Sequence, residues 1–473
     1  MSSVEALGDL GPADRYELGW RDCLDYADGT GTGLSEATIR RISAAKGERA
    51  EVLQRRLQAL EAFEELPTPA WVGPSLVGLD LSEIHYYARP IEHRVDDWAA
   101  LPPVMRATFD RLGVPEAERF QLEGLCAQYD SEVVYERTRA ELDPLGVVFC
   151  DMDTAVREHW DLIEPYLGSV VPPGSGKFAA LNAAVWSGGT FLYVPAGVHV
   201  ERPLQTYFRV NAERLGQFEH TLIVVEDGGF AHYVDACSAT TYESASLHVG
   251  VVEVIAAENS RCRVSGVQYW PKNVFNIATK QAVARRGARV EWIDANLGAR
   301  ATLTHPGVIL EGEGAHGSVL SIGYAASGQH QDSGARMMHL APRTTSTVTS
   351  KSIARDGGRS DYRGVIHMAP EAEASRSFVR CDSLILDDAS RSDTYPSIEM
   401  EAGTSRVGHE ASVSRLDDAR LFYLMSRGLT EQEATALLVA GFVEPISREL
   451  PLDCAREVNR LIALDMEAAG AVG

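Results

Sequence analysis

Hydrophobic and polar positions repeat with two different periods along this chain. Residues 35–65 place apolar side chains at near-helical spacing behind Ser35, a residue type that commonly caps the N-terminus of a helix. This stretch predicts two amphipathic helices, and further helix is expected over about 95–165. We therefore expect a mostly helical N-terminal region over residues 1–167. The apolar stripe comprises Ile39, Ile42, Leu53, Leu57, Leu60 and Phe63.

From about residue 168 to 415 the period changes to the alternation that strands require. Val, Ile, Thr and Tyr alternate with short turns rich in Gly, Asn, Ser and Asp, and no helical segment intervenes. Repeating strand-turn units predict a β-helix over 168–415, in which each unit stacks on its neighbours. A β-sandwich built from the same strands is the alternative. An arginine recurs just after the turns, most regularly at Arg359, Arg376, Arg391 and Arg406, which are separated by 17, 15 and 15 residues.

Residues 416–473 return to helical spacing. Thr430 and Glu433 form a capping box ahead of apolar positions, and Gly441 is expected to end that helix. A second helix is predicted from about Leu452 to Ala469, with one apolar stripe. We interpret this C-terminal helical domain as a candidate docking surface.

Composition excludes several classes of protein. The chain has 473 residues, is 45% hydrophobic and carries a net charge of -23. Such acidity disfavours nucleic acid and anionic membranes as partners and chiefly supports solubility. No apolar run approaches the roughly 20 residues that span a bilayer, and the N-terminus lacks a signal-peptide pattern, so we expect a cytoplasmic protein. The seven cysteines form no CxxC pair and indicate a reducing compartment.

The sequence lacks the common nucleotide-binding and hydrolase motifs. In PPGSGKFAA, Val171 stands where a phosphate loop needs its first glycine, and Phe178 replaces the Ser or Thr after the lysine. The glycines of GEGAHG precede strand-like alternation instead of a helix. No HExxH zinc motif occurs, and no GxSxG stands in a strand-turn-helix context. If ATP matters to this protein, another subunit must supply its site.

Candidate chemistry gathers near the end of the strand-rich region. Cys381 and the adjacent pair His409-Glu410 lie in turn-punctuated strand sequence. A thiolate, an imidazole and a carboxylate together suit iron, zinc or a sulfide-bridged cluster. Residue statistics alone favour a plainer interpretation, a buried cysteine and a surface His-Glu pair.

Longer strings resemble one known family, the SufB/SufD proteins of the SUF iron–sulfur cluster assembly system, and most closely its SufB scaffold subunits. The resemblance runs from about Tyr16 to the final glycine and rests on long, specific strings. They include NAAVWSGGTFLYVPAGVHV, GQHQDSGARMMHLAP, TSKSIARDGGRSDYRG, RSDTYPSIE and LFYLMSRGLTEQEA. The resemblance implies a right-handed parallel β-helix core flanked by N-terminal and C-terminal helical domains.

The resemblance also implies roles for individual residues. Cys237 corresponds to the cysteine that accepts persulfide sulfur, and Cys381 with His409 and Glu410 corresponds to the site of the nascent, transient cluster. Arg380 and Arg376 could lower the pKa of the Cys381 thiol if their side chains lie near it. Without the resemblance, Gln268, Trp270, Asn211 and Arg209 would be interpreted as ordinary ladder or interior residues of a solenoid. The resemblance instead implies a route of polar residues that carries sulfur from Cys237 towards the cluster site. Those residues are Arg209, Asn211, Glu219, Gln268, Trp270 and Lys280.

Partners and cofactors follow from the same resemblance. It implies a SufC-like ABC ATPase on the C-terminal helices, so that ATP acts only through that subunit. It implies a SufD-like paralogue, or a second copy of this chain, along the β-helix. A cysteine desulfurase with its SufE-type or SufU-type carrier would donate sulfur, and reduced flavin (FADH2) is a candidate source of electrons. The chain itself is expected to be a scaffold and not an enzyme.

Departures from the family pattern leave other interpretations open. Gly408 stands where some relatives carry Glu, and ACSAT replaces the usual GCxAP around Cys237. These changes are compatible with a specialised paralogue that acts as a homodimer in a dedicated pathway. A SufD-like structural partner without its own cluster is a second alternative. A β-helix carbohydrate-active enzyme is a third, with Asp294, Asp332 and Asp382 as available acids.

Overall fold

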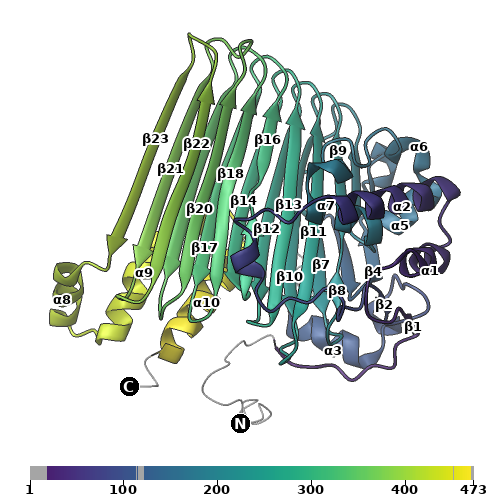
Figure 1. The fold of residues 1–473 in the computed structure, drawn as a ribbon, viewed down its shortest axis with the longest axis horizontal. Coiled ribbons are helices and arrows are strands. Elements are labelled where there is room, and N and C mark those ends of the chain that lie inside the picture. Colours follow the sequence, from purple (N-terminus) through teal and green to yellow (C-terminus); the bar gives the residue numbers. More distant parts are fainter. Residues whose placement is uncertain (1–18, 113, 115–121, 451, 470–473) are drawn as a thin grey trace.

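The computed structural model describes residues 19–112, 114, 122–450 and 452–469, and its core is a parallel β-solenoid (Figure 1). Along the solenoid, successive segments of the chain alternate between two sheets, so each coil contributes one segment to each sheet, and in two coils the segment in the second sheet is divided into two short strands. The ten-stranded sheet contains β4 (Glu132–Thr138), β3 (Gly124–Tyr129), β7 (Leu204–Val210), β10 (Phe230–Ala239), β12 (Arg261–Trp270), β14 (Arg289–Gly298), β17 (His316–Ala325), β19 (Thr345–Ala354), β21 (Arg376–Ile385) and β23 (Arg406–Arg415), in this spatial order.

The second sheet has eleven strands. Its main path contains β5 (Val148–Asp151), β6 (Thr190–Val194), β9 (His220–Val225), β11 (Ser246–Ala256), β13 (Val274–Ala284), β15 (Ala301–Thr304), β18 (His330–His339), β20 (Arg359–Met368) and β22 (Arg391–Met400). The short strands β8 (Gly216–Gln217) and β16 (Gly307–Leu310) pair alongside this path. A separate antiparallel pair joins β1 (Asp28–Gly29) to β2 (Ala88–Arg89).

Parallel pairing in register confirms the predicted β-helix and rules out the β-sandwich, whose sheets would be antiparallel. The arginine repeat follows directly from this geometry. Arg359, Arg376, Arg391 and Arg406 each begin a strand, and they pair as Arg359 with Arg391 and Arg376 with Arg406. A spacing of about 15 residues is therefore half a coil, because consecutive strands belong to opposite sheets.

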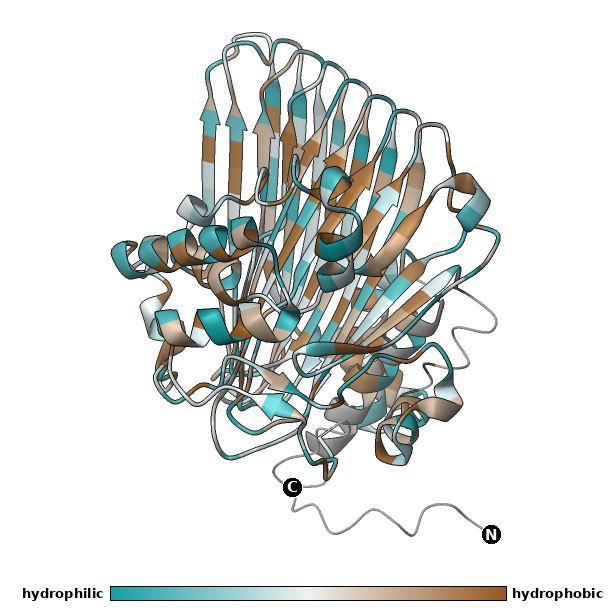
Figure 2. Cartoon of the chain, turned by 90° about the vertical axis from the view of Figure 1, so that its right-hand side faces the viewer, coloured by the Kyte–Doolittle hydropathy of each residue, from teal (hydrophilic) through white to brown (hydrophobic). Residues whose placement is uncertain are grey.

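Alternate side chains of every strand face the solenoid interior. Figure 2 shows the resulting alternation of brown and teal along neighbouring strands. The largest apolar cluster lies inside and draws on both sheets, through residues such as Val254, Val290, Trp292, Val348 and Cys381. Cys237 on β10 and Cys381 on β21 both face this interior, with four strands of the ten-stranded sheet between them, and Cys262 on β12 faces it as well.

The region 1–167 contains more strand than we predicted. Helices α1 (Glu36–Lys46) and α2 (Ala50–Glu65) form as expected, and the Ser35 side chain accepts a hydrogen bond from the Thr38 amide. Strands β3, β4 and β5, however, occupy part of the expected helical stretch and extend both sheets, because β3 pairs with β7 and β5 with β6. The remaining helices here are short: α3 (Pro103–Arg111), α5 (Met152–Glu158) and α6 (Trp160–Ile163), followed by α7 (Lys177–Val185).

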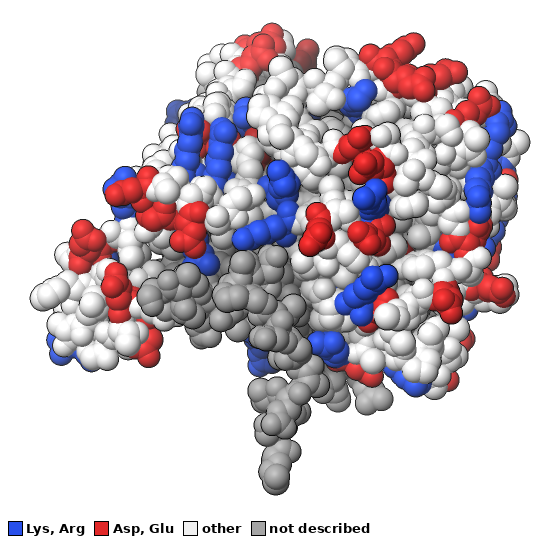
Figure 3. Space-filling model, turned by 60° about the horizontal axis from the view of Figure 1, so that its bottom comes forward, with Lys and Arg blue, Asp and Glu red and all other residues white. Residues whose placement is uncertain are grey.

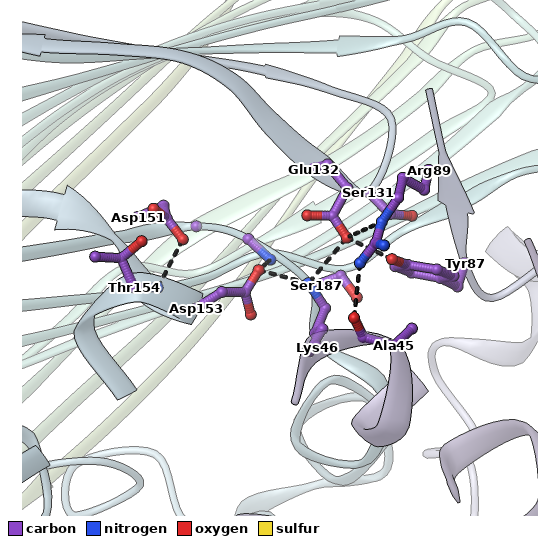
Figure 4. Close-up of polar contacts among 12 residues, drawn as sticks. Ala45, Lys46, Tyr87, Arg89, Ser131, Glu132, Asp151, Asp153, Thr154 and Ser187 are labelled. Carbon is purple, nitrogen blue, oxygen red and sulfur yellow. Dashed lines mark hydrogen bonds and ion pairs between the residues drawn. The ribbon is translucent and has the colours of Figure 1, made fainter. Parts of the chain in front are cut away.

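A buried polar cluster fastens α1 to the solenoid (Figure 4). The Lys46 ammonium lies 2.5 Å from Asp153 and 3.4 Å from Glu132. Tyr87 donates a hydrogen bond to Glu132 at 2.5 Å, and Arg89 donates one to the carbonyl of Ala45 at 2.8 Å. Because Lys46 is fully buried, these carboxylates compensate for its desolvation and fix the orientation of the helix.

The C-terminal helices are α8 (Asp418–Ser426), α9 (Glu431–Ser447) and α10 (Leu452–Ala469). The capping box of Thr430 and Glu433 is confirmed. The prediction that Gly441 ends its helix is wrong, since α9 continues six residues further. Packing explains this, because Val443 and Ile446 are buried against the solenoid, and such burial outweighs the cost of a helical glycine, about 1 kcal/mol. Among the described residues, no helix combines the length and apolarity needed to cross a membrane.

Charges of both signs are distributed over the surface. On the face drawn in Figure 3, lysine and arginine side chains are interspersed with aspartate and glutamate. Neighbouring coils pair many of them, as in Arg261 with Glu291 at 3.0 Å. The net charge of -23 therefore does not gather into one acidic field on this face.

Candidate functional site

The last coils of the solenoid bring a thiol and an imidazole together. Cys381 on β21 faces inward and is 3% exposed, and its Sγ lies 3.8 Å from Nε2 of His409 on β23. The pairing register explains the contact. Val379 pairs with His409 and Cys381 with Ala411, so His409 lies on the inward face one pair away from the thiol. β23 is also the edge strand of its sheet.

The protonation state of Cys381 is set by its surroundings. Burial raises the pKa of the thiol to about 12, the hydroxyl of Tyr362 opposes this rise, and Asp382 adds to it. Arg380 points to the opposite face and bonds Asp382 at 3.0 Å. The expected lowering of the thiol pKa by Arg380 and Arg376 is therefore absent, because strand alternation directs both guanidinium groups outward. A metal ion would have to displace the thiol proton.

Glu410 is not brought to this pair. It follows His409 directly in β23, is exposed, and pairs in register with the outward-facing Arg380. Over the described residues, the two groups of three or more possible metal ligands whose donor atoms lie within 4.8 Å of one another are elsewhere: His330, Asp332 and Asp361, and His367, Glu399 and Glu401. The first of these is already neutralised, because Arg363 bonds Asp332 at 2.7 Å and Arg359 bonds Asp361.

The second candidate centre surrounds Cys237. This thiol faces inward on β10, is 3% exposed, and packs in an apolar cluster with Phe208 and Trp270. Burial raises its pKa well above the ordinary value, Asp235 and Glu219 add to the rise, and Lys280 opposes it. The Cys237 thiol therefore has both apolar side chains and buried charged side chains around it.

A chain of hydrogen bonds runs through the interior beside Cys237. Asn276 donates to Gln268 at 2.6 Å, and the His248 ring lies 2.8 Å from Asn276 and 2.5 Å from Glu219. The indole N–H of Trp270 donates to Gln268 at 3.4 Å, and the His248 and Trp270 rings are 4.7 Å apart. Burial opposes a charged His248, but Glu219 outweighs it and raises the pKa of the imidazole.

Lys280 holds the charged part of this interior. Its ammonium lies 2.7 Å from Asp294 and 3.6 Å from Asp235. Gly266 leaves room for the three groups, because a Cβ there would come within 2.6 Å of oxygens from both aspartates. The network leaves buried oxygens of Asp235 and Asp294 without a hydrogen-bond partner. The interior is thus a polar compartment in an otherwise apolar core.

The six residues implied for the sulfur route divide into two groups. Glu219, Gln268, Trp270 and Lys280 lie inside with Cys237. Arg209 and Asn211 do not, because Arg209 pairs with Ser238 on the outward face of its sheet and both side chains contact residues 20–26.

Sequence reasoning assigned no role to three groups of this interior, His248, Asp235 and Asn276. The strand alternation of HVGVVEV could have indicated that His248 faces inward with Gly250. Its partners lie 28 to 29 residues away, however, and the lengths of the coils are not readable from the pattern. The acids considered for carbohydrate chemistry do not meet: Asp294 bonds Lys280 inside, whereas Asp332 and Asp382 face outward to arginines.

Two surfaces expose large apolar side chains. The last coil exposes Tyr395, Ile398, Met400 and Val413, and Phe378 lies beside them. The C-terminal helices expose Phe422 (73%), Tyr423, Met425 and Leu437. Exposed apolar groups on open sheet edges and helix faces are typical of protein-protein contacts.

Comparisons with known proteins agree with this architecture. The model of the SufBD core domain of the SUF system for FeS cluster assembly matches residues 208–442, and that of the SufBD N-terminal region matches residues 124–206. The chain is 48% identical over 470 residues to the iron-sulfur cluster assembly protein SufB of Bacillus subtilis strain 168, covering 99% of this chain and 100% of that protein.

Staphylococcal proteins are similar as well. A SufBD family protein of Staphylococcus haemolyticus is 47% identical over 441 residues, covering 93% of this chain and 94% of its own. One from Staphylococcus aureus strain USA300 is 46% identical over 458 residues, covering 97% and 98%. Full-length identity, two matching domain models and the parallel solenoid together lead to one assignment. The chain belongs to the SufB/SufD family of the SUF iron–sulfur cluster assembly system.

Proposed function

We propose that this chain is a scaffold on which a nascent iron–sulfur cluster is built at Cys381 and His409. The observation that carries the proposal is the 3.8 Å contact between Sγ and Nε2 on the last two coils of one sheet. Thiolate and imidazole are both ligands for iron in iron–sulfur sites. A site with few protein ligands also suits a cluster that must later leave. The role of Glu410 as a third ligand stays a prediction.

We propose that the remaining ligands come from a partner chain on the open end of the solenoid. Strands β22 and β23 are sheet edges with unpaired backbone groups, and apolar side chains are exposed beside them. A SufD-like paralogue or a second copy of this chain fits such a surface. A homodimer in a dedicated pathway is the alternative to the heterodimer, and the mass of the purified complex distinguishes them.

Sulfur enters, in this proposal, at Cys237. A cysteine desulfurase with its SufE-type or SufU-type carrier supplies it as a persulfide. The polar interior supports movement of sulfur away from Cys237, because Gln268, Lys280 and Glu219 offer both donors and acceptors inside an apolar wall. Reduced flavin is the electron source in this proposal.

A SufC-like ATPase docks on the C-terminal helices in this account. Phe422, Tyr423 and Leu437 give those helices an exposed apolar surface, which is typical of a protein interaction site. The chain has no phosphate loop of its own, so ATP hydrolysis belongs to that partner.

Anaerobic reconstitution with iron and sulfide tests the cluster site. We expect the native chain to gain visible absorbance and acid-labile sulfide, and Cys381→Ser to lose most of both. Cys262→Ser is the matched control, because Cys262 is an equally buried, inward thiol of the apolar core whose strand partners are Ala231 and Val290. Equal loading of native chain and Cys381→Ser would refute the assignment of the site.

A further inference from the structure

Residues 19–27, called the strap below, cross the solenoid at the end of β10, the strand that carries Cys237. In Figure 1 this purple segment follows the grey N-terminal trace along the lower edge of the solenoid. The carbonyl of Trp20 accepts hydrogen bonds from Arg209 at 2.7 Å and from Thr240 at 2.9 Å. Thr240 comes three residues after Cys237 and directly after β10. The strap is therefore attached to the strand end that carries the sulfur-accepting thiol.

Asn211 binds the strap through both ends of its amide. Its Oδ1 accepts from the Asp22 amide at 2.9 Å, and its Nδ2 donates to the Asp22 carbonyl at 3.0 Å. The Asp22 carboxylate accepts from Thr108 and Tyr129, both at 2.5 Å. Residues 19–26 belong to no β-strand. The Asn211 amide thus makes the two hydrogen bonds to Asp22 that a neighbouring strand would otherwise make.

Tyr26 closes the apolar wall around Cys237. Its ring packs against the cluster that contains Cys237, Phe208 and Trp270. Its hydroxyl donates to Asp130 at 2.6 Å. A cavity of about 330 Å³ lies between the strap and Asn211. Through Tyr26 the strap therefore covers part of the apolar cluster that contains the thiol, whereas its bonds to Arg209 and Asn211 lie on the outward side of the sheet.

The strap is held by polar contacts and by three partly buried side chains: Leu24 and Tyr26 pack against apolar clusters, and Trp20 stacks with Arg111 and Arg209. Asp22 is its one buried side chain, and the others are half-buried or exposed. Segments with few buried apolar contacts open at a small fraction of the global unfolding free energy. Cys237, in contrast, is 3% exposed, and no persulfide on another protein can reach it in the closed form.

We propose that the strap is a gate over Cys237 that opens to admit the sulfur donor, and that Arg209 and Asn211 are positioning residues that hold it closed. The proposal rests on Cys237 being the sulfur acceptor. In that transfer the Cys237 sulfur bonds the terminal sulfur of the donor persulfide, the donor S–S bond breaks, and the Cys237 proton passes to the departing donor thiol. No net oxidation occurs, so the step needs contact but no further reactant.

Labelling of cysteines in the full chain with a small maleimide, read by mass spectrometry, tests the gate. Asn211→Ala removes both bonds to Asp22, and we expect Cys237 to react roughly tenfold faster than in the native chain. Tyr26→Phe removes only the hydroxyl, and a smaller increase is expected. Glu213→Gln is the matched control, since Glu213 lines the same cavity but bonds Ser244 instead of the strap.

Two internal references make the result decisive. Cys23 is exposed within the strap and should be labelled in every variant, which shows that the reagent is active, whereas buried Cys262 should stay protected. Unchanged Cys237 labelling in both strap variants overturns the gate. So does a rise that Cys262 shares, because the whole solenoid would then be opening. If the strap variants label faster yet native Cys237 takes no sulfur from a persulfide donor, the gate stands and the acceptor role fails.

Discussion

At the scale of single residues, the interior of the solenoid contains a few charged side chains whose burial in an apolar core is energetically unfavourable. Lys280, Asp235 and Asp294 are buried together, and separating any one of them from the others would leave an uncompensated charge. Burying such groups brings little stability compared with apolar residues of similar volume. Their presence at this position therefore favours a chemical role over a structural one.

A buried histidine makes stability depend on pH. The pKa of His339 is lowered to about 4 because burial disfavours the charged ring, which lies within 2.9 Å of the Thr344 and Ser346 hydroxyls. The unfolded chain, with a pKa near 6.5, binds more protons between these values, so stability falls as pH drops from 6.5 towards 4. The loss from this group between pH 7 and pH 5 is roughly 2 kcal/mol.

Urea unfolding at pH 7 and pH 5 measures that loss. His339→Gln keeps a hydrogen-bonding side chain without a titration, and we expect it to lose roughly 2 kcal/mol less than the native chain between the two pH values. Carboxylates also titrate between pH 7 and pH 5, but their contribution to stability is the same in both chains and cancels in the comparison. Identical pH dependence in both chains would contradict a neutral, buried His339.

At the scale of elements, the sequence predicted the type of each helix or strand better than the residues at which it begins and ends. Helices α1, α2 and α10 and the strands of the solenoid follow from apolar spacing and turn residues. Strands β3 and β5 were missed because each is short and its partner in the solenoid, β7 for β3 and β6 for β5, lies tens of residues away. Strand β4 was missed with β3, to which it pairs as a hairpin. The end of α9 was missed because packing against the solenoid overrides the local signal of Gly441.

Gly441 gives this argument a test. It lies in α9, is exposed, and has nothing within 4 Å of where a Cβ would be. Gly441→Ala should therefore raise the free energy of unfolding by about 0.5 to 1 kcal/mol through a smaller loss of backbone entropy. Gly266→Ala is the contrasting control and should destabilise, because its Cβ would collide with Asp235 and Asp294. A destabilised Gly441→Ala would mean that α9 is not continuous in solution.

At the scale of the whole molecule, the solenoid keeps its two candidate sites on one continuous interior. The sequence indicated Cys237 and Cys381 through family resemblance, but not which side chains accompany them. Arg209 and Asn211 lie outside because strand alternation separates neighbours such as Phe208 and Arg209. The open edges β22 and β23 leave the cluster site at the end of the stack, where another chain could complete it.

The central claim is that Cys381 and His409 hold the nascent cluster together. X-ray absorption at the iron edge, on the anaerobically loaded native chain and on His409→Ala, tests it most directly. The account predicts sulfur ligation in both samples and an imidazole contribution that the variant lacks. Identical spectra with the same iron content would contradict a cluster ligated by His409.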